Sequence, residues 1–255
     1  MSQPFRLNKE GLINRNKKIS FTFNGKKLFG YEGDTIASAL IANGIHLVGR
    51  SFKYHRPRGF FGAGVEEPNA KLQVEFNGHS EPNVNATEME LVEGLSATSQ
   101  NCWPSVNFDI GAINNFLKMF FPAGFYYKTF MWPKSFWYKI YEPFIRKAAG
   151  LGVASIEKDK ERYEHKFEYC DLLVTGSGPS GLASAYAAAK NGAKVILAED
   201  KPRFGGTLLT DDVSIDNLSG KDWAEKIITE LKSMPNVTLK NRSQVFGYYD
   251  HNMLV

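Results

Sequence analysis

A glycine-rich turn carries the strongest chemical signal in the sequence. The run GSGPSG at 176–181 follows the apolar stretch 171–175 and precedes residues 182–190, which are rich in helix formers. In such a turn the first glycine allows a tight bend, the second lets backbone N–H groups approach a pyrophosphate, and the third lets the helix pack on the strand. The helix N-terminus adds partial positive charge, so two phosphates can bind there without a lysine or arginine.

An acidic residue follows at the spacing that a dinucleotide site requires. A second apolar run, 194–198, ends at Glu199, 18 residues beyond Gly181. A carboxylate at this point can accept a hydrogen bond from a ribose hydroxyl. An acid in place of an arginine favours the unphosphorylated ribose of FAD or NAD over that of NADP. The residues alone leave the choice between FAD and NAD open.

A glycine pair beyond the acid adds a second place where backbone could approach phosphate. The order of acid and glycine pair resembles that of the two-dinucleotide-binding flavoproteins. The candidate cofactor-binding residues are Gly176, Ser177, Gly178, Pro179, Ser180, Gly181, Glu199, Asp200, Lys201, Gly205, Gly206, Thr207 and Val245. We predict no catalytic residue and no metal ligand in this chain, because no nucleophile, general base or histidine spacing supports one.

Composition limits the classes of protein to consider. The chain has 255 residues, enough for one or two domains, and its net charge of +4 is small and mixed, which argues against nucleic acid as a partner. Two cysteines, Cys102 and Cys170, are too few for a disulfide framework. No apolar run is long enough to cross a membrane and the N-terminus does not read as a signal peptide, so we expect a cytoplasmic protein.

After an N-terminal arm at 1–14, residues 15–95 predict a small α+β domain. An alternating stretch at 19–23, the turn Asn24-Gly25 and a second stretch at 27–31 indicate a hairpin. A helix at 35–43 capped by Asp34 and a strand at 72–76 follow. This order is that of the β-grasp fold of plant-type ferredoxins.

Such ferredoxins bind a [2Fe–2S] cluster through a C-x₄-C-x₂-C loop and one distant cysteine. When this cysteine pattern is aligned with residues 60–69, its three cysteine positions correspond to Phe61, Glu66 and Asn69. We therefore predict a ferredoxin-like domain with no iron–sulfur cluster, and we expect Glu66 and Glu67 to be solvated.

A basic loop at 50–59 carries five side chains that can be positive, interleaved with aromatic residues. It could bind an anion or the acidic surface of a partner. The simpler interpretation, which we prefer, packs the loop on a neighbouring domain with its guanidinium groups paired to local carboxylates.

The region 96–168 is interpreted as a docking segment and linker. Between Asn115 and Phe144, 13 of 30 residues are Phe, Tyr or Trp, with prolines and lysines that predict short helical pieces and exclude a membrane span. We prefer docking to another subunit or domain over an internal satellite core. Residues 169–255 then form a Rossmann-like FAD/NAD-binding domain, which we expect to be truncated because its sheet needs further strands.

Four unusual stretches carry a family resemblance: 33–40, 48–59, 64–70 and 121–133. From about Arg15 onward, the chain resembles the N-terminal part of the alpha subunits of heterotetrameric sarcosine oxidases. The resemblance implies oxidation of sarcosine to glycine, with hydrogen peroxide formed and the one-carbon unit passed to tetrahydrofolate.

The same resemblance implies the cofactors and partners. NAD would bind at Gly176–Gly181 and Glu199, with FAD as the alternative at that site. FAD and FMN would lie on or near a partner subunit, and the partners would be the beta, gamma and delta subunits. Two other interpretations stay open: a subunit of a related opine oxidase, amino-acid oxidase or hydrogen cyanide synthase, and a non-catalytic scaffold that NAD stabilises.

Overall fold

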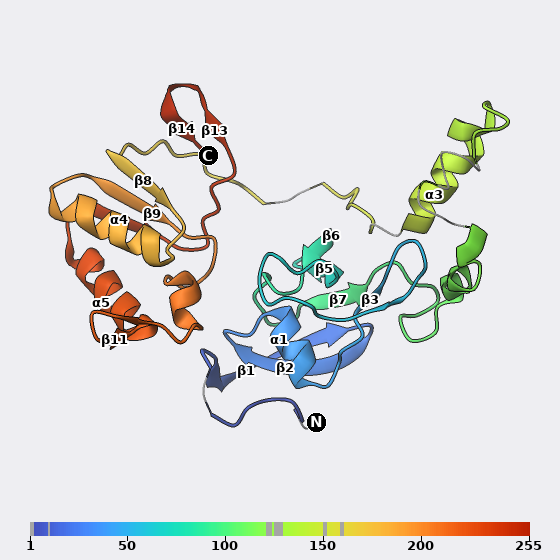
Figure 1. Ribbon diagram of the computed structural model, residues 1–255, viewed down its shortest axis with the longest axis horizontal. Helices are drawn as coiled ribbons and strands as arrows, with labels where there is room; N and C mark the ends of the chain where they lie inside the picture. The colour runs from blue at the N-terminus through green and yellow to red at the C-terminus, as the bar shows by residue number, and fades with distance from the viewer. Residues whose placement is uncertain (1–2, 10, 121–123, 125–129, 150–151, 159–160) are drawn as a thin grey trace. The chain divides into compact units, whose positions relative to one another are not determined.

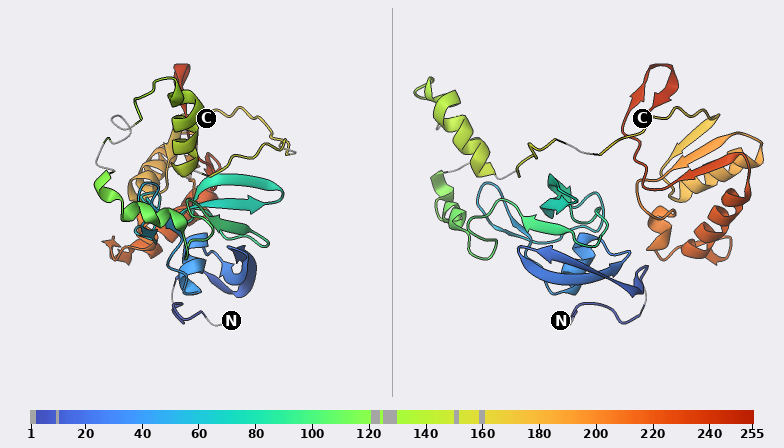
Figure 2. Two further views of the ribbon diagram at one scale, coloured as in Figure 1. Left: turned by 90° about the vertical axis from the view of Figure 1, so that its right-hand side faces the viewer. Right: turned by 180° about the vertical axis from the view of Figure 1, so that it is seen from behind.

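The computed structural model describes residues 3–9, 11–120, 124, 130–149, 152–158 and 161–255. The chain divides into two units, Met1–Glu161 and Arg162–Val255, and each is described by itself. Figures 1 and 2 show their elements from three sides. Within the described residues, no helix has both the length and the apolar character needed to cross a membrane.

The first unit is built on a mixed five-stranded sheet with strand order β2-β1-β7-β5-β6. Strands β1 and β7 are parallel, and the other neighbours are antiparallel. The strands are β1 (Asn14–Phe23), β2 (Lys26–Glu32), β5 (Lys71–Phe76), β6 (His79–Asn85) and β7 (Ser96–Ser99), with a separate pair β3 (Gly49–Arg50) and β4 (Pro57–Arg58). The predicted hairpin at 19–31 and strand at 72–76 are both present.

The single α-helix of this sheet region, α1 (Ile36–Ala42), packs its apolar face into the core. Alternate residues of β1 and β5 point the same way, because successive side chains of a strand face opposite sides. The core they form comprises Ile19, Phe21, Phe23, Leu28, Ile36, Leu40, Val48, Leu72, Val74, Leu91 and Leu95. The predicted hairpin and helix both contribute residues to this core.

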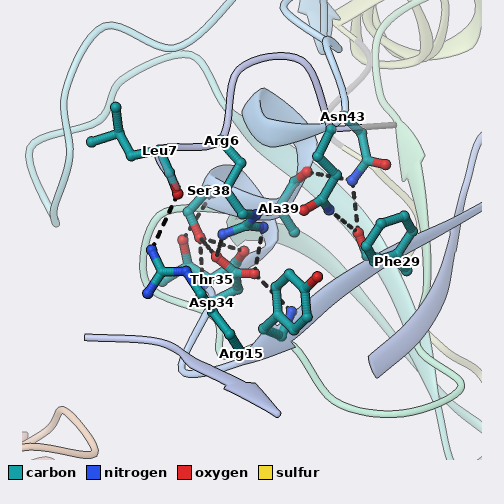
Figure 3. Close-up of polar contacts among 11 residues, drawn as sticks. Arg6, Leu7, Arg15, Phe29, Asp34, Thr35, Ser38, Ala39 and Asn43 are labelled. Atoms are coloured by element: carbon teal, nitrogen blue, oxygen red, sulfur yellow. Dashed lines mark hydrogen bonds and ion pairs between the residues drawn. The ribbon is translucent and has the colours of Figure 1, made fainter. Parts of the chain in front are cut away.

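The N-terminus of α1 differs from the prediction by one residue. Thr35, not Asp34, is the N-cap, and its hydroxyl accepts the N–H of Ser38. Asp34 is 1% exposed and accepts a bidentate pair from Arg6, at 2.7 and 3.1 Å, together with the Ser38 hydroxyl (Figure 3). A carboxylate buried this deeply requires several charge-assisted bonds, so it binds the arm instead of serving as the cap.

The arm also borders a cavity of about 420 Å³ against α1, lined mainly by apolar side chains. Arg15 donates to the carbonyl of Leu7 across the arm (Figure 3). These contacts hold residues 3–9 on the helix.

The basic loop packs on residues 106–115 of the same unit and not on a neighbouring domain, so this part of the expectation is wrong. Arg50 donates to the carbonyl oxygens of His55, Val106 and Asn107, and Arg56 donates to the amide oxygen of Asn115. The prediction that the guanidinium groups pair with carboxylates is therefore wrong for these two arginines. A carboxylate from outside the loop does contact it: Asp109 lies 2.6 Å from Nδ1 of His55.

The aromatic segment consists of short helical pieces, as predicted. They are η1 (Ile110–Asn115), η2 (Lys118–Phe120), the π-helical turn η3 (Trp137–Tyr141) and α3 (Glu142–Ala149). Phe125, Tyr126 and Tyr127 lie outside the described residues. Residues 152–158 and 161–170 contain neither helix nor strand, in agreement with a linker.

The second unit has a parallel sheet with strand order β12-β9-β8. Helices α4 and α5 connect these strands and contact each other on one face of the sheet (Figure 1). The elements are β8 (Leu172–Thr175), α4 (Pro179–Lys190), β9 (Val195–Ala198), η4 (Gly206–Leu209), β10 (Ser214–Ile215), β11 (Leu218–Ser219), α5 (Gly220–Ser233), β12 (Val237–Lys240), β13 (Tyr248–Tyr249), η5 (Asp250–Asn252) and β14 (Met253–Leu254). This is the βαβαβ arrangement of one half of a doubly wound nucleotide-binding fold.

The core of the second unit lies between the sheet and the two helices. Strand β9 is buried along its whole length, as a central parallel strand should be. It packs against Leu182 and Ala185 of α4 and against Ile227 and Leu231 of α5. The carboxyl ends of β8 and β9 therefore lie side by side, next to the start of α4.

Candidate dinucleotide-binding site

The glycine-rich turn connects β8 directly to α4. Gly176 has φ +88°, a left-handed conformation that glycine adopts without strain. A Cβ on Gly181 would clash with the carbonyl oxygen of Gly176, so the third glycine lets the helix start close to the strand. Nothing lies within 4 Å of the position that a Cβ on Gly178 would take. The backbone at the second glycine is therefore open on the side where phosphate would approach.

The first turn of α4 presents backbone donors without a side-chain cap. Gly178 is the N-cap and Pro179 occupies the first helical position, where an N–H would have no acceptor within the helix, so the missing N–H of proline costs no hydrogen bond. The N–H groups of Ser180 and Gly181 have no acceptor within the helix, since the first turn of any helix lacks them. Together with the helix dipole, such unpaired donors favour a negatively charged group at this end of a helix.

Glu199 lies directly behind this turn and is 5% exposed. Its Oε2 accepts the Ser177 N–H at 2.8 Å and also the Ser177 hydroxyl, and its Oε1 accepts the Lys201 N–H at 3.1 Å. Burial by itself would raise the pKa of Glu199, but hydrogen bonding with the Asp200 side chain and hydrogen bonds donated by Ser177 outweigh it and lower that pKa. The carboxylate is ionised and held in place.

Ser177 joins the two glycine motifs. Its side chain is fully buried, and its hydroxyl oxygen accepts the Gly205 N–H at 2.9 Å. Gly206 packs so closely that a Cβ there would lie 2.9 Å from the Cα of Gly178. The Ser177 side chain therefore faces inward, and its backbone N–H is bonded to Glu199 as well. No sequence pattern predicts this contact, because Ser177 and Gly205 are far apart along the chain.

The other candidate residues lie around this centre. Asp200, Lys201 and Thr207 are exposed, and Val245 is half-buried in the irregular stretch before β13. The loop after β12 also closes on the end of β9, because Ser243 donates its N–H to the carbonyl of Glu199. The structure thus brings together the turn, Glu199 and the glycine pair.

The loop at 60–70 of the first unit shows an arrangement that the sequence analysis missed. Glu67 is 1% exposed, so the expectation that it is solvated is wrong; Glu66 is exposed, as expected. The Glu67 carboxylate accepts four backbone N–H groups, at 2.6 Å from Phe61, 2.5 Å from Gly62, 2.7 Å from Asn69 and 3.2 Å from Ala70. Burial raises the pKa of Glu67, but these bonds outweigh it and lower that pKa.

Family models match both units. Residues 16–102 match a family described as a 2Fe-2S iron-sulfur cluster binding domain, and residues 171–241 match one described as FAD dependent oxidoreductase. The chain thus combines a ferredoxin-like domain with the nucleotide-binding region of FAD-dependent oxidoreductases. The second match supports FAD chemistry for the turn at 176–181.

Two relatives extend the similarity to nearly the whole chain. The chain is 56% identical over 249 residues to the sarcosine oxidase alpha subunit of Rhizobium meliloti (strain 1021), covering 98% of this chain and 25% of the relative. It is 32% identical over 263 residues to that of Corynebacterium sp. (strain U-96), covering 100% and 22%. The resemblance to sarcosine oxidase alpha subunits is therefore confirmed, and the chain spans about a quarter of the length of these curated relatives.

A solved structure shares the fold. L-proline dehydrogenase from P. horikoshii aligns with a TM-score of 0.57 at 19% identity, covering 98% of this chain and 37% of that one. At this identity the likeness concerns the fold alone.

The residues of the first unit do not fit an iron–sulfur cluster. A [2Fe–2S] cluster of the ferredoxin type needs four thiolates. The matched segment contains one cysteine, Cys102, and burial raises the pKa of its thiol. Among the described residues, no group of three or more His, Cys, Asp or Glu side chains could hold a metal ion.

Proposed function

We propose that this chain is the dinucleotide-binding and docking part of an alpha subunit in a multi-subunit sarcosine oxidase. That enzyme would oxidise sarcosine to glycine with oxygen, release hydrogen peroxide and transfer the one-carbon unit to tetrahydrofolate. The observation that carries the proposal is the 56% identity to a sarcosine oxidase alpha subunit, which includes both units and the segment between them.

In this proposal the turn holds the pyrophosphate of the nucleotide. The N–H groups of Gly178, Ser180 and Gly181 would donate to phosphate oxygens, and the open space at Gly178 would admit them. Glu199 would accept a hydrogen bond from the adenosine ribose, because a fixed, ionised carboxylate keeps acceptor capacity beyond its bonds to Ser177. Gly205, Gly206 and Thr207 would border the phosphates.

The nucleotide in this proposal is NAD, with FAD as the alternative that the family match favours. Glu199 suits either, since both carry the same adenosine ribose. Denaturing the purified chain releases the bound nucleotide, and the mass of the released molecule distinguishes NAD from FAD. FAD also shows the visible absorption of a flavin, and NAD does not.

No residue of this chain is proposed to react with the amine. A flavin supplies hydride-accepting chemistry to such an oxidase, and FAD and FMN are proposed to lie on or near the partner subunits. The described residues of this chain would bind and position the nucleotide.

The aromatic segment is proposed to dock on the beta, gamma or delta subunits. Phe116, Met119, Trp132 and Tyr138 are each at least 83% exposed. Apolar side chains gathered in one segment at this exposure indicate an interaction surface. Coexpression with these subunits should protect residues 108–144 from hydrogen exchange; unchanged exchange in an assembled complex would contradict the docking role.

The turn itself is tested by Gly178→Glu, which places a side chain and a negative charge where the pyrophosphate would lie. We expect the purified variant to lose its nucleotide. Ala187→Glu is the matched control, because it adds the same carboxylate to an exposed position farther along α4 and should keep the nucleotide. Full nucleotide content in Gly178→Glu would reject the site.

A further inference from the structure

The buried carboxylate of Glu67 has no part in the proposed reaction, yet it is among the most constrained side chains of the first unit. Its four donors come from both ends of one loop: Phe61 and Gly62 at the start, Asn69 and Ala70 at the end. One side chain therefore closes the loop on itself.

Those donors need an acceptor. A buried N–H without a partner costs about 1–3 kcal/mol, and here one buried N–H (Ala70) and three partly buried ones converge on a single carboxylate. A buried carboxylate is in turn stable only when it is well hydrogen-bonded. Each side of the contact thus satisfies the other.

The spacing of the residues around this point is that of a cluster loop. Gly62, Glu67 and Ala70 are separated by four and two residues, the C-x₄-C-x₂-C pattern of plant-type ferredoxins. This register is one residue later than Phe61, Glu66 and Asn69, which the sequence alone suggested. The earlier register fails because it puts the exposed residues Phe61 and Glu66 at ligand positions and leaves Glu67 unexplained.

A fourth position lies beside the loop. Thr87 is buried, and its hydroxyl donates to the carbonyl of Gly64 at 2.7 Å. Gly64 also accepts the N–H of Glu67 at 3.1 Å. Thr87 thus occupies the place of a distant ligand that reaches back to the loop.

We propose that the Glu67 carboxylate fills the place of a [2Fe–2S] cluster, so that this loop is a cluster site closed by a side chain of the chain itself. In cluster domains, backbone N–H groups donate to the cluster's sulfur atoms; here the corresponding groups donate to Glu67. The first unit then holds no electron carrier and folds without iron. This inference does not depend on which amine the complex oxidises.

The first experiment compares two glutamine variants of the 255-residue chain. Glu67→Gln keeps the shape but replaces one acceptor oxygen with a donor that faces N–H groups, so we expect the unfolding midpoint of the first unit to fall by roughly 10 °C. Glu66→Gln is the matched control and should shift it by less than about 3 °C. Equal shifts in the two variants would overturn the role of Glu67.

The second experiment measures iron. The wild-type chain, purified anaerobically and incubated with ferrous iron, sulfide and thiol, should retain less than about 0.1 iron per chain after desalting, an order-of-magnitude limit for four sites without thiolates. Retention of two irons and two sulfides per chain would overturn the proposal.

The third experiment reopens the site. The variant with Gly62→Cys, Glu67→Cys, Ala70→Cys and Thr87→Cys should take up a cluster with the absorption and electron paramagnetic resonance spectrum of a [2Fe–2S] centre. The control set, Phe61→Cys, Glu66→Cys, Asn69→Cys and Thr87→Cys, should not. Equal uptake by the two sets, or none by a folded first set, would overturn the register; if the first set does not fold, the glutamine pair decides.

Discussion

The loop at 60–70 and the turn at 176–181 use a buried glutamate in opposite ways. Glu67 lies inside its loop and takes up four backbone N–H groups. Glu199 lies behind its turn, where it binds Ser177 and Lys201 and leaves the N–H groups at the start of α4 free of any side-chain cap. A loop rich in N–H groups can thus be closed by the chain itself or kept open for a ligand, depending on whether the carboxylate lies inside the loop or behind it.

The open turn depends most on the third glycine, so the largest effect is expected from Gly181→Ala. The added methyl group would clash with the carbonyl of Gly176 and separate α4 from β8. We expect a loss of about 2–4 kcal/mol in the stability of the second unit, together with loss of the nucleotide. Hydrogen exchange of residues 171–240 in increasing urea measures this loss.

The control for Gly181→Ala is Ala183→Ser, an exposed change on the same helix, which should stay within about 0.5 kcal/mol of wild type. A stable Gly181→Ala protein that keeps its nucleotide would show that the strand–helix approach is not needed to keep the turn open.

Removing the Ser177 hydroxyl should have a smaller effect. Ser177→Ala takes one donor from Glu199 and leaves the Gly205 N–H without its acceptor. We expect a cost of about 1–3 kcal/mol by the same hydrogen-exchange measurement. Ser184→Ala, exposed on α4, is the control; if both variants cost the same, Ser177 does not link the two glycine motifs.

The closed loop should make the first unit sensitive to acid. The folded state lowers the pKa of Glu67, so its contribution to stability is complete above the ordinary glutamate pKa of about 4.3 and is lost as pH falls through the lower folded value. One such group changes the free energy of unfolding by at most about 1.4 kcal/mol per pH unit.

Unfolding curves of the first unit between neutral and acidic pH test this dependence. Glu67→Gln should flatten the curve on its acid side, whereas Glu66→Gln should leave the slope unchanged. If the free energy of unfolding of Glu67→Gln falls with decreasing pH as steeply as that of the wild type, other carboxylates cause the acid sensitivity.

The smallest effect on stability is expected at the aromatic segment. Phe116 is exposed, so Phe116→Ser should change the free energy of unfolding by no more than about 0.5 kcal/mol. It should nevertheless weaken assembly with the partner subunits, measured by size-exclusion chromatography of coexpressed chains. Unchanged assembly would place the contact elsewhere in the segment.

The elements of the fold could be predicted from the sequence because they depend on local patterns. The alternation of apolar and polar residues predicts the hairpin at 19–31, and the glycine spacing at 176–181 predicts the order of β8, turn and α4. Side-chain partners could not be predicted in this way. Glu67 and Glu66 are neighbours in a polar stretch, and only closure of the loop determines which one is buried.

The same reason explains the other differences. Asp34 and Thr35 are both good N-cap residues, and the choice between them depends on Arg6, which comes from a distant part of the sequence. A guanidinium group can donate to a carboxylate or to a carbonyl oxygen. Arg50 donates to carbonyl oxygens because the backbone of residues 106–107 passes next to it. Ser177 faces Glu199 because the end of β9 passes behind the turn.

The bidentate pair between Arg6 and Asp34 has a practical consequence for anyone shortening the protein. The arm at 3–9 has no regular structure and would ordinarily be trimmed before crystallisation or fused to an affinity tag. Its removal would leave the Asp34 carboxylate, 1% exposed, with its Ser38 and Tyr31 bonds but without a countercharge. Trimming from the N-terminal side should therefore stop before Arg6, so that its pair with Asp34 is kept.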